Sequence, residues 1–193
     1  KGSEKMRFYS LRLSLLPTVD FNERVSALLD FCDKALIDDV MFFIAPEEVH
    51  VGHITVEEAK KYADVIGKAG AELKKRGIGV SLNPWCTLVH YDGGRKLKNG
   101  QNFRTMTGAD GVKAEVAVCP LDKSWREYYA ELLNFYVETL RPDILWFEDD
   151  MRLSNHEPVA HGCFCEEHLR RYNARLNTNY TREEFVKRIF TDK

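Results

Sequence analysis

The residues from Val40 to Ala45 form an uninterrupted apolar run, VMFFIA, which is typical of a β-strand covered on both faces. Such strands belong to parallel sheets packed between layers of helix. Three more strands are predicted from apolar runs at Phe8–Leu16, Ile78–Leu82 and Ile144–Phe147, the last as a buried strand. Helical patterns alternate with these strands, so the sequence predicts an α/β fold with right-handed parallel connections.

Local capping signals place the helices. They predict Phe21–Leu36 capped by Asp20, a helix from the Thr55–Glu58 capping box to Gly77, another from the Ser124–Glu127 capping box to about Leu140, then Glu166–Leu176, and finally Arg182–Phe190 capped by Thr181. The polar segment from about Tyr91 to Val112 is too long for a plain connection and is expected to be functional or mobile. Val116–Cys119 is expected to be either a short extra strand or an extended return.

Two parallel architectures fit this pattern, an open doubly wound sheet and a (β/α)8 TIM barrel. The first strand is followed by Leu16-Pro17-Thr18-Val19-Asp20, which lacks the glycine-rich turn of a dinucleotide-binding fold. Polar side chains instead follow the carboxyl end of each strand, the face on which a barrel builds its active site. Because a complete barrel needs about 250 residues, we expect residues 1–193 to supply about the first four βα units of one catalytic domain. Residues 1–6 are expected to be a flexible end or one left by processing.

Composition limits the partners. A net charge of -2 argues against a non-specific nucleic-acid binder, which carries a basic excess. No apolar run approaches the roughly 20 residues needed to span a membrane, and the polar start KGSEKMRFYS is not a signal peptide. We therefore expect no nucleic-acid or membrane partner and a cytoplasmic location. No organic cofactor is expected, and homo-oligomerisation stays open.

Three consecutive carboxylates, Glu148, Asp149 and Asp150, follow the predicted fourth strand. Neighbouring negative charge raises the pKa of a carboxyl group, so such a cluster is a natural setting for the general acid of a glycoside hydrolase, and we expect one of the three to be that acid/base. One alternative is a solvated acidic loop or a helix cap. Another is a metal-dependent hydrolase, in which the acids bind Mg²⁺ or Mn²⁺ with His156 nearby.

Residues around these acids and after the other strands are expected to contact a carbohydrate. Arg152 would limit the repulsion between the acids, and Asn83 and His156 are candidates for hydrogen bonds to hydroxyl groups. Trp85 and Trp146 would stack on sugar rings, although core packing is the commoner role of a single tryptophan. The full expected substrate-binding set is Arg12, Asn83, Trp85, Trp146, Arg152, Asn155 and His156.

The five cysteines are an odd number and too sparse for a disulfide scaffold. Cys163-x-Cys165-x-x-His168 has the local spacing of a metal knuckle, and Cys119 is a candidate remote ligand. Three cysteines and a histidine are an accepted tetrahedral zinc set, and a site made wholly of protein ligands is structural. The alternative is reduced thiols packed under a loop.

The segment GCFCEEHLRRYNARLNTNYTREEF resembles the part of family 42 β-galactosidases, which are clan A glycoside hydrolases, that follows their zinc knuckle. That family carries an Asn-Glu motif on strand four, then a Cys-x-Cys-x-x-Cys knuckle, with an earlier cysteine completing the zinc site. Cys119 matches the earlier cysteine, and His168 stands where the family has its last cysteine. The resemblance covers the fourth unit and the knuckle, and the first three units only as a general pattern.

The resemblance implies a barrel glycosidase with a structural zinc. Matching the strand ends puts Asp150 at the acid/base position, and a one-residue shift puts Asp149 there. Aspartate in place of the family's glutamate means either a different substrate position or a site that is no longer a galactosidase's. The family's nucleophile lies on strand seven, so we expect no activity from these residues alone. A catalytically degenerate carbohydrate-binding barrel is the non-enzyme alternative.

Overall fold

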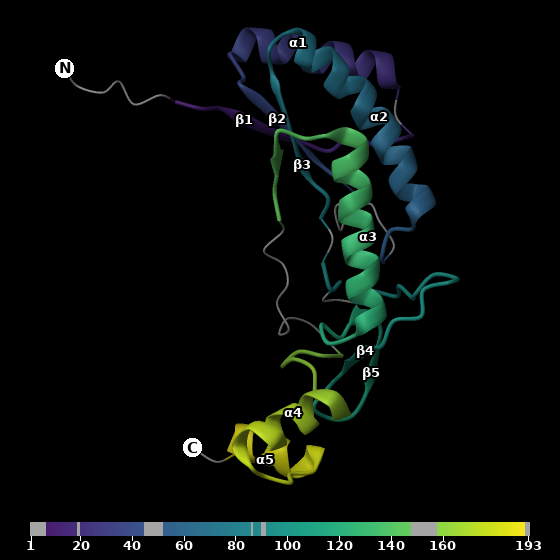
Figure 1. Ribbon diagram of the computed structural model, residues 1–193, viewed down its shortest axis with the longest axis vertical. Coiled ribbons are helices and arrows are strands. Elements are labelled where there is room, and N and C mark those ends of the chain that lie inside the picture. The colour runs from purple at the N-terminus through teal and green to yellow at the C-terminus, as the bar shows by residue number, and fades with distance from the viewer. Residues whose placement is uncertain are drawn as a thin grey trace, which may run out of the picture. The chain divides into compact units, whose positions relative to one another are not determined.

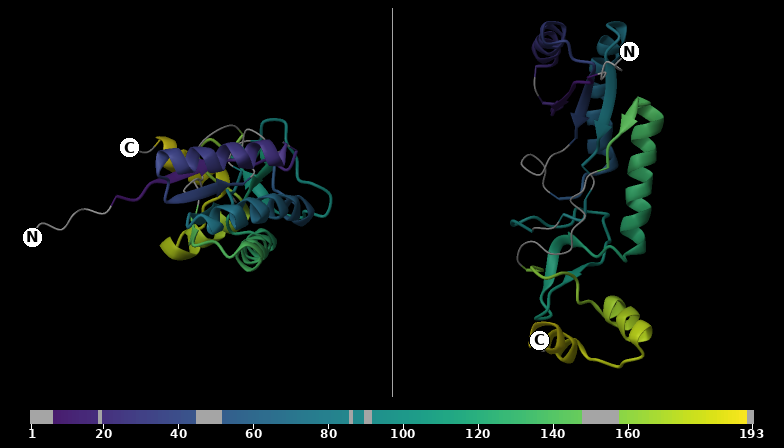
Figure 2. Two further views of the ribbon diagram at one scale, coloured as in Figure 1. Left: turned by 90° about the horizontal axis from the view of Figure 1, so that it is seen from above. Right: turned by 90° about the vertical axis from the view of Figure 1, so that its left-hand side faces the viewer.

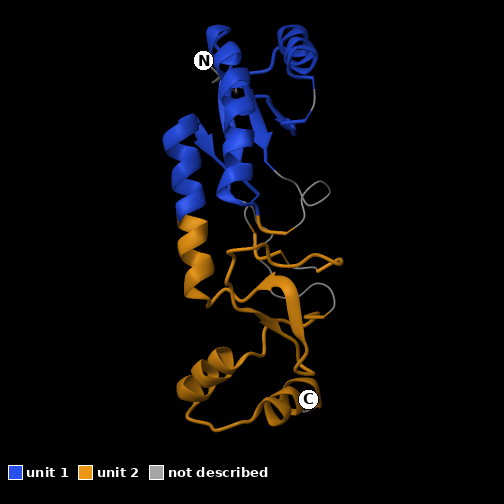
Figure 3. Ribbon diagram, turned by 90° about the vertical axis from the view of Figure 1, so that its right-hand side faces the viewer, with its two compact units in different colours: residues 1–50, 54–85, 131–148 blue, residues 51–53, 86–130, 149–193 orange. Residues whose placement is uncertain are grey.

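The computed structural model describes residues 7–18, 20–44, 52–85, 87–89, 92–147 and 158–191. The chain divides into two compact units, coloured separately in Figure 3. The first comprises residues 1–50, 54–85 and 131–148, and the second comprises residues 51–53, 86–130 and 149–193. Each unit is described by itself below.

The first unit is built on a four-stranded parallel sheet with the order β1-β2-β3-β6 (Figures 1 and 2). Its strands are β1 (Ser10–Leu13), β2 (Asp39–Phe43), β3 (Gly79–Asn83) and the short β6 (Ile144–Leu145). Every pair of neighbouring strands is parallel, and each strand lies next to the one that precedes it in this sheet along the chain. The α/β class and the parallel sheet predicted from the sequence are confirmed.

The strand register separates two faces of this sheet. Leu11 is paired with Val40, and Val40 with Val80, so these three apolar residues lie in one row. Gly70 of helix α2 (Val56–Lys75) lies against this row, where an added Cβ would be 3.4 Å from a Val80 methyl carbon. Side chains alternate between faces along a strand, so Arg12 and its neighbours in the sheet point to the face opposite this helix.

Local sequence signals account for the helices of the first unit. Helix α1 (Phe21–Ala35) begins where the Asp20 carboxylate accepts a hydrogen bond from the Glu23 amide. Helix α2 (Val56–Lys75) begins with the predicted Thr55 capping box. The third helix, α3 (Lys123–Leu140), contributes residues 131–140 to this unit and residues 123–130 to the other.

The second unit contains an antiparallel pair, β4 (Thr105–Thr107) and β5 (Lys113–Val118), and the helices α4 (Glu166–Leu176) and α5 (Arg182–Thr191). Helix α5 begins with the predicted Thr181 cap. An apolar cluster fills this unit, formed by Leu88, Met106, Ala114, Ala117, Val118, Trp125 and Val159.

Three predictions from sequence differ from the structure. Asp122, not Ser124, caps α3, because its carboxylate accepts the Trp125 amide at 2.9 Å. The polar segment before Val112 contains β4, a strand that the sequence pattern did not predict. The run Ile144–Phe147 was predicted to be a buried strand, but β6 is the edge of the sheet, and Trp146 and Phe147 are exposed.

Within the part of the chain that the structure describes, no helix has the length and apolar character needed to cross a membrane.

Candidate metal centre

The second unit brings together four side chains that the sequence predicted as metal ligands, Cys119, Cys163, Cys165 and His168. Cys119 follows β5 directly, and its amide donates to the carbonyl of Arg104, which precedes β4. The β-pairing therefore fixes the backbone of the first ligand.

A short loop before α4 carries the next two ligands. The Phe164 amide, between Cys163 and Cys165, donates to the Thr107 carbonyl at 2.7 Å and so ties this loop to β4. Cys165 occupies the N-cap position of α4, but its side chain makes no capping hydrogen bond. Its sulfur is therefore left to face the cluster. His168 lies in the first turn of α4, three residues later, where helical spacing returns its side chain to the same side.

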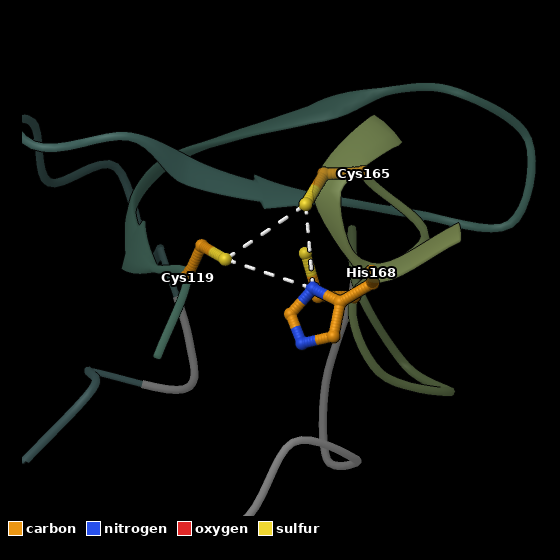
Figure 4. A group of neighbouring side chains, drawn as sticks. Cys119, Cys165 and His168 are labelled. Carbon is orange, nitrogen blue, oxygen red and sulfur yellow. Dashed lines mark hydrogen bonds between the residues drawn. The ribbon is translucent and has the colours of Figure 1, made fainter. Parts of the chain in front are cut away.

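The side chains of Cys119, Cys165 and His168 point toward one another (Figure 4). The Sγ atoms of Cys119 and Cys165 are 3.8 Å apart. The Nδ1 atom of His168 is 3.7 Å from Cys119 Sγ and 3.3 Å from Cys165 Sγ. With Cys163 included, all four ligand atoms lie within 4.8 Å of one another.

Cys119 and Cys165 are buried, and Cys163 and His168 are partly buried. Backbone groups surround the sulfurs: hydrogen bonds from the backbone of Thr107 and Cys165 reach the sulfur of Cys163, and one from the backbone of His168 reaches that of Cys165. Such N–H donors stabilise thiolates over thiols. For Cys165, the backbone donor of His168 therefore favours negative charge on the sulfur.

The ionisation of the cluster follows from its hydrogen bonds. Those from Cys119 and Cys163 hold the pKa of Cys165 far below that of a free thiol, whereas hydrogen bonds with Cys119 and Cys165 raise the pKa of Cys163. Hydrogen bonds to Cys119 and Cys165 raise the pKa of His168 to about 9. In the metal-free cluster these shifts favour an imidazolium on His168 beside a thiolate on Cys165. A bound cation would take the place of the imidazolium proton.

Three thiols and one imidazole converging on a common centre can hold a metal ion. All four positions are protein ligands, so the arrangement leaves no open coordination site for a substrate or a water molecule. Among the described residues, Cys32, Cys119, Cys163 and Cys165 form no disulfide.

The predicted substrate-binding residues of the first unit lie at the carboxyl ends of its strands. The Arg12 guanidinium is 3.7 Å from the centre of the Phe43 ring, a cation–π contact. Phe43 in turn meets the Trp85 ring edge-on, with the two centres 6.4 Å apart. Asn83, the last residue of β3, accepts the Trp85 amide through Oδ1 at 2.9 Å. The sheet therefore brings Arg12, Asn83 and Trp85 to one end.

Trp85 has a backbone φ of 40°, a conformation that a bulky residue rarely adopts without support from its surroundings. Its ring is buried, whereas that of Trp146 is 43% exposed. Their contact with a sugar stays a prediction. The other predicted catalytic and substrate residues, Glu148, Asp149, Asp150, Arg152, Asn155 and His156, lie outside the described residues.

Two residues that contact the predicted site residues, Phe43 and Arg104, were not identified from the sequence. Phe43, which separates Arg12 from Trp85, is one of several apolar residues in its strand, and nothing in the pattern marks it. Arg104 lies beside the metal-ligand cluster, and its proximity to Cys119 depends on β4, which carried no sequence signal.

The chain was compared with protein families and with curated proteins. No family model matches it, and no curated protein matches it.

Proposed function

We propose that Cys119, Cys163, Cys165 and His168 bind a structural Zn²⁺ ion. The observation that carries this proposal is the spacing of the ligand atoms. A tetrahedral zinc with Zn–S bonds of about 2.3 Å and a Zn–N bond of about 2.0–2.1 Å has S···S edges of about 3.8 Å and S···N edges of about 3.5 Å. The observed separations of 3.8 Å, 3.7 Å and 3.3 Å lie close to these edges.

The weak apolar anchoring of the last two helices gives such a zinc a structural role. None of the residues of α4 or α5, all of which the structure describes, is buried. Contacts such as the Tyr172–Phe185 ring pair, with centres 4.1 Å apart, link the two helices. A metal bound by Cys119 after β5 and by His168 in α4 would attach α4 to the β4–β5 pair, and its binding energy would then contribute to folding.

Metal analysis of the protein purified without added chelator tests this proposal. We expect close to one zinc per chain, and we expect Cys119→Ser and Cys165→Ser each to lose it. Cys32→Ala removes a buried thiol of α1, outside the cluster, and should leave the zinc content unchanged. Tetrahedral sulfur coordination is checked by replacing zinc with Co²⁺ and recording its sulfur-to-metal charge-transfer bands. Wild-type protein that binds no metal would overturn the proposal.

We also propose that the chain belongs to a glycoside hydrolase with a (β/α)8 barrel. The supporting observation is the strand order β1-β2-β3-β6, in which each parallel strand neighbours the one before it. Barrel strands follow one another in this way, whereas a doubly wound sheet reverses direction at a switch point. Arg12 and Asn83 lie at the carboxyl end of this sheet, and the carboxylates from Glu148 to Asp150 come soon after β6 in the sequence.

In this proposal Asp150 or Asp149 is the general acid/base, and Glu148 is its acidic neighbour. The carbohydrate is bound by the set Arg12, Asn83, Trp85, Trp146, Arg152, Asn155 and His156. Two alternatives predict other results: a degenerate barrel binds sugars without cleaving them, and a metal-dependent hydrolase loses activity on removal of Mg²⁺ or Mn²⁺.

A panel of aryl glycosides, assayed with the full-length protein, distinguishes these possibilities. We expect hydrolysis of at least one glycoside, and we expect Asp149→Asn and Asp150→Asn to differ sharply in rate because only one of them carries the transferred proton. Equal rates in both variants and in the wild type would rule out the catalytic assignment. Binding without turnover would favour the degenerate barrel.

A further inference from the structure

Arg104 lies beside the sulfur atoms of the proposed zinc site. Its carbonyl accepts the Cys119 amide at 2.9 Å, so β-pairing holds Arg104 opposite this ligand. The charge of its guanidinium interacts with the sulfurs of Cys119 and Cys165. Arg104 and Cys165 also line the same pocket of about 330 Å³. One guanidinium is thus positioned near two of the three ligand sulfurs.

The net charge of the proposed zinc site explains why a guanidinium beside its sulfurs matters. Three thiolates around one Zn²⁺ leave an excess negative charge, which makes the sulfurs more basic and more reactive toward electrophiles. A guanidinium that donates a charge-assisted hydrogen bond to a thiolate withdraws part of that charge.

The other cations near this pocket have different partners. The Nε atom of Arg182 donates to the Phe164 carbonyl at 3.1 Å. Arg170 and Arg171 both pair with Glu167. Lys113 lines the pocket but pairs with Thr107, at the opposite end of the short β-ladder from Arg104. Arg104 is therefore the cation best placed to act on the ligand sulfurs.

We propose that Arg104 is a positioning residue of the metal site, which stabilises the zinc-bound thiolates by hydrogen bonding to Cys119 and by its charge near Cys165. This inference rests on the zinc site proposed above. It assigns Arg104 a role in retaining the metal and in shielding the thiolates from reagents that enter the adjoining pocket. Partners in the outer shell of a metal site change metal affinity by about 10–100-fold when they are removed.

Zinc release and thiol reactivity test this role in the full chain. The zinc-loaded wild type, Arg104→Gln, Arg104→Lys and Lys113→Gln are mixed with a chromogenic chelator, and the rate of zinc transfer is recorded. The rate of cysteine alkylation by iodoacetamide is measured in parallel. Because Arg104 is an exposed residue, we expect Arg104→Gln to accelerate both reactions by about tenfold, the lower end of the outer-shell range. Arg104→Lys keeps the charge without the planar donor fork and should give intermediate rates.

Lys113→Gln removes the same charge from the same pocket and should leave both rates close to those of the wild type. Equal acceleration by Lys113→Gln and Arg104→Gln would overturn the inference, because pocket charge alone would then explain the effect. Zinc-loaded wild type with unchanged release in both Arg104 variants would overturn it as well, while leaving the zinc site intact. If Arg104→Gln does not fold, Arg104→Lys is compared with the wild type instead: faster zinc release and alkylation support the inference, and unchanged rates overturn it. Absence of zinc from the wild type would instead overturn the metal site itself.

Discussion

The Nδ1 atom of His168 lies 3.3 Å from the Sγ atom of Cys165, and both residues belong to the start of α4. Helical spacing produces this proximity locally, whereas Cys119 is brought to the pair by the β4–β5 ladder. In the proposed metal site, a short sequence motif therefore positions Cys165 and His168, whereas tertiary structure positions Cys119.

The histidine position should accept a cysteine but not an alanine. His168→Cys retains a sulfur donor on the same helical face and converts the ligand set to four cysteines, an accepted zinc set. We expect it to keep about one zinc per chain by native mass spectrometry, and we expect His168→Ala to bind zinc far more weakly. His161→Ala is the control, because this histidine packs against the Phe190 ring, outside the cluster. Full zinc retention by His168→Ala would contradict the assignment.

Zinc binding should release protons, and zinc affinity should rise with pH. The raised pKa of His168, about 9, means that its imidazole is protonated at neutral pH in the metal-free protein. Cys163 is also protonated there because its pKa is raised. Zinc must displace both protons, so the apparent affinity increases as the pH rises toward about 9. Calorimetric titrations in two buffers of different ionisation enthalpy measure the released protons, and identical heats in both buffers would contradict this prediction.

The metal-free protein should be most stable between about pH 6.5 and 9. The raised pKa of His168 contributes stability that is fully present below 6.5 and is lost as the pH rises through about 9. The lowered pKa of Cys165 contributes stability that is present above 9.0 and is lost as the pH falls. Between pH 6.5 and 9.0, the free energy of unfolding falls with pH because of His168 and rises with pH because of Cys165, so the two effects oppose each other. Above 9.0 the raised pKa of Cys163 makes unfolding easier, and below 6.5 the effect of Cys165 is unopposed.

Urea unfolding of chelator-treated protein across this pH range is the measurement. The matched comparison is the Cys165→Ser variant, which lacks the thiolate. Its His168 keeps only the interaction with Cys119, so its stability should fall as the pH rises above 6.5. A metal-free wild type that loses stability just as steeply over this interval would show that the imidazolium–thiolate pair does not form.

Sequence patterns succeeded where the physical cause is local. The Thr55–Glu58 capping box and the spacing from Cys163 to His168 are short-range features, and both recur in the structure as predicted. The parallel sheet was predicted from apolar runs, because strands such as β2 need a helix layer to cover them. Cys119, although distant in sequence, was included as a candidate ligand and does lie in the cluster.

The failures concern features that depend on tertiary partners. Ser124 and Asp122 are both competent helix caps, and only the geometry of the preceding turn selects the second. The residues of β4 carry no apolar alternation, and this strand exists through pairing with β5. Trp146 and Phe147 are as apolar as a buried strand, yet within the described residues β6 pairs only with β3. Arg104 became visible as a functional candidate only through that missed strand.

Asp39 should be the most sensitive polar residue of the parallel sheet. Its carboxylate is 1% exposed and accepts hydrogen bonds from the Ser10 hydroxyl at 2.6 Å and the Ser81 hydroxyl at 2.7 Å. Asp39→Ala leaves two hydroxyls without an acceptor, and a loss of one such partner costs about 1–3 kcal/mol. We therefore expect urea unfolding to show a loss of about 2–4 kcal/mol with an unchanged m-value.

The adjacent Asp38 provides the control for Asp39. The Asp38 carboxylate accepts a hydrogen bond from the exposed Tyr9 amide at 2.8 Å, and water can replace it there. Asp38→Ala should therefore lower the free energy of unfolding by less than about 1 kcal/mol. Because β1, β2 and β3 all contribute to the Asp39 site, the difference between the two variants measures how strongly this buried carboxylate links the three strands. Equal losses in Asp38→Ala and Asp39→Ala would show that burial of Asp39 does not strengthen its hydrogen bonds.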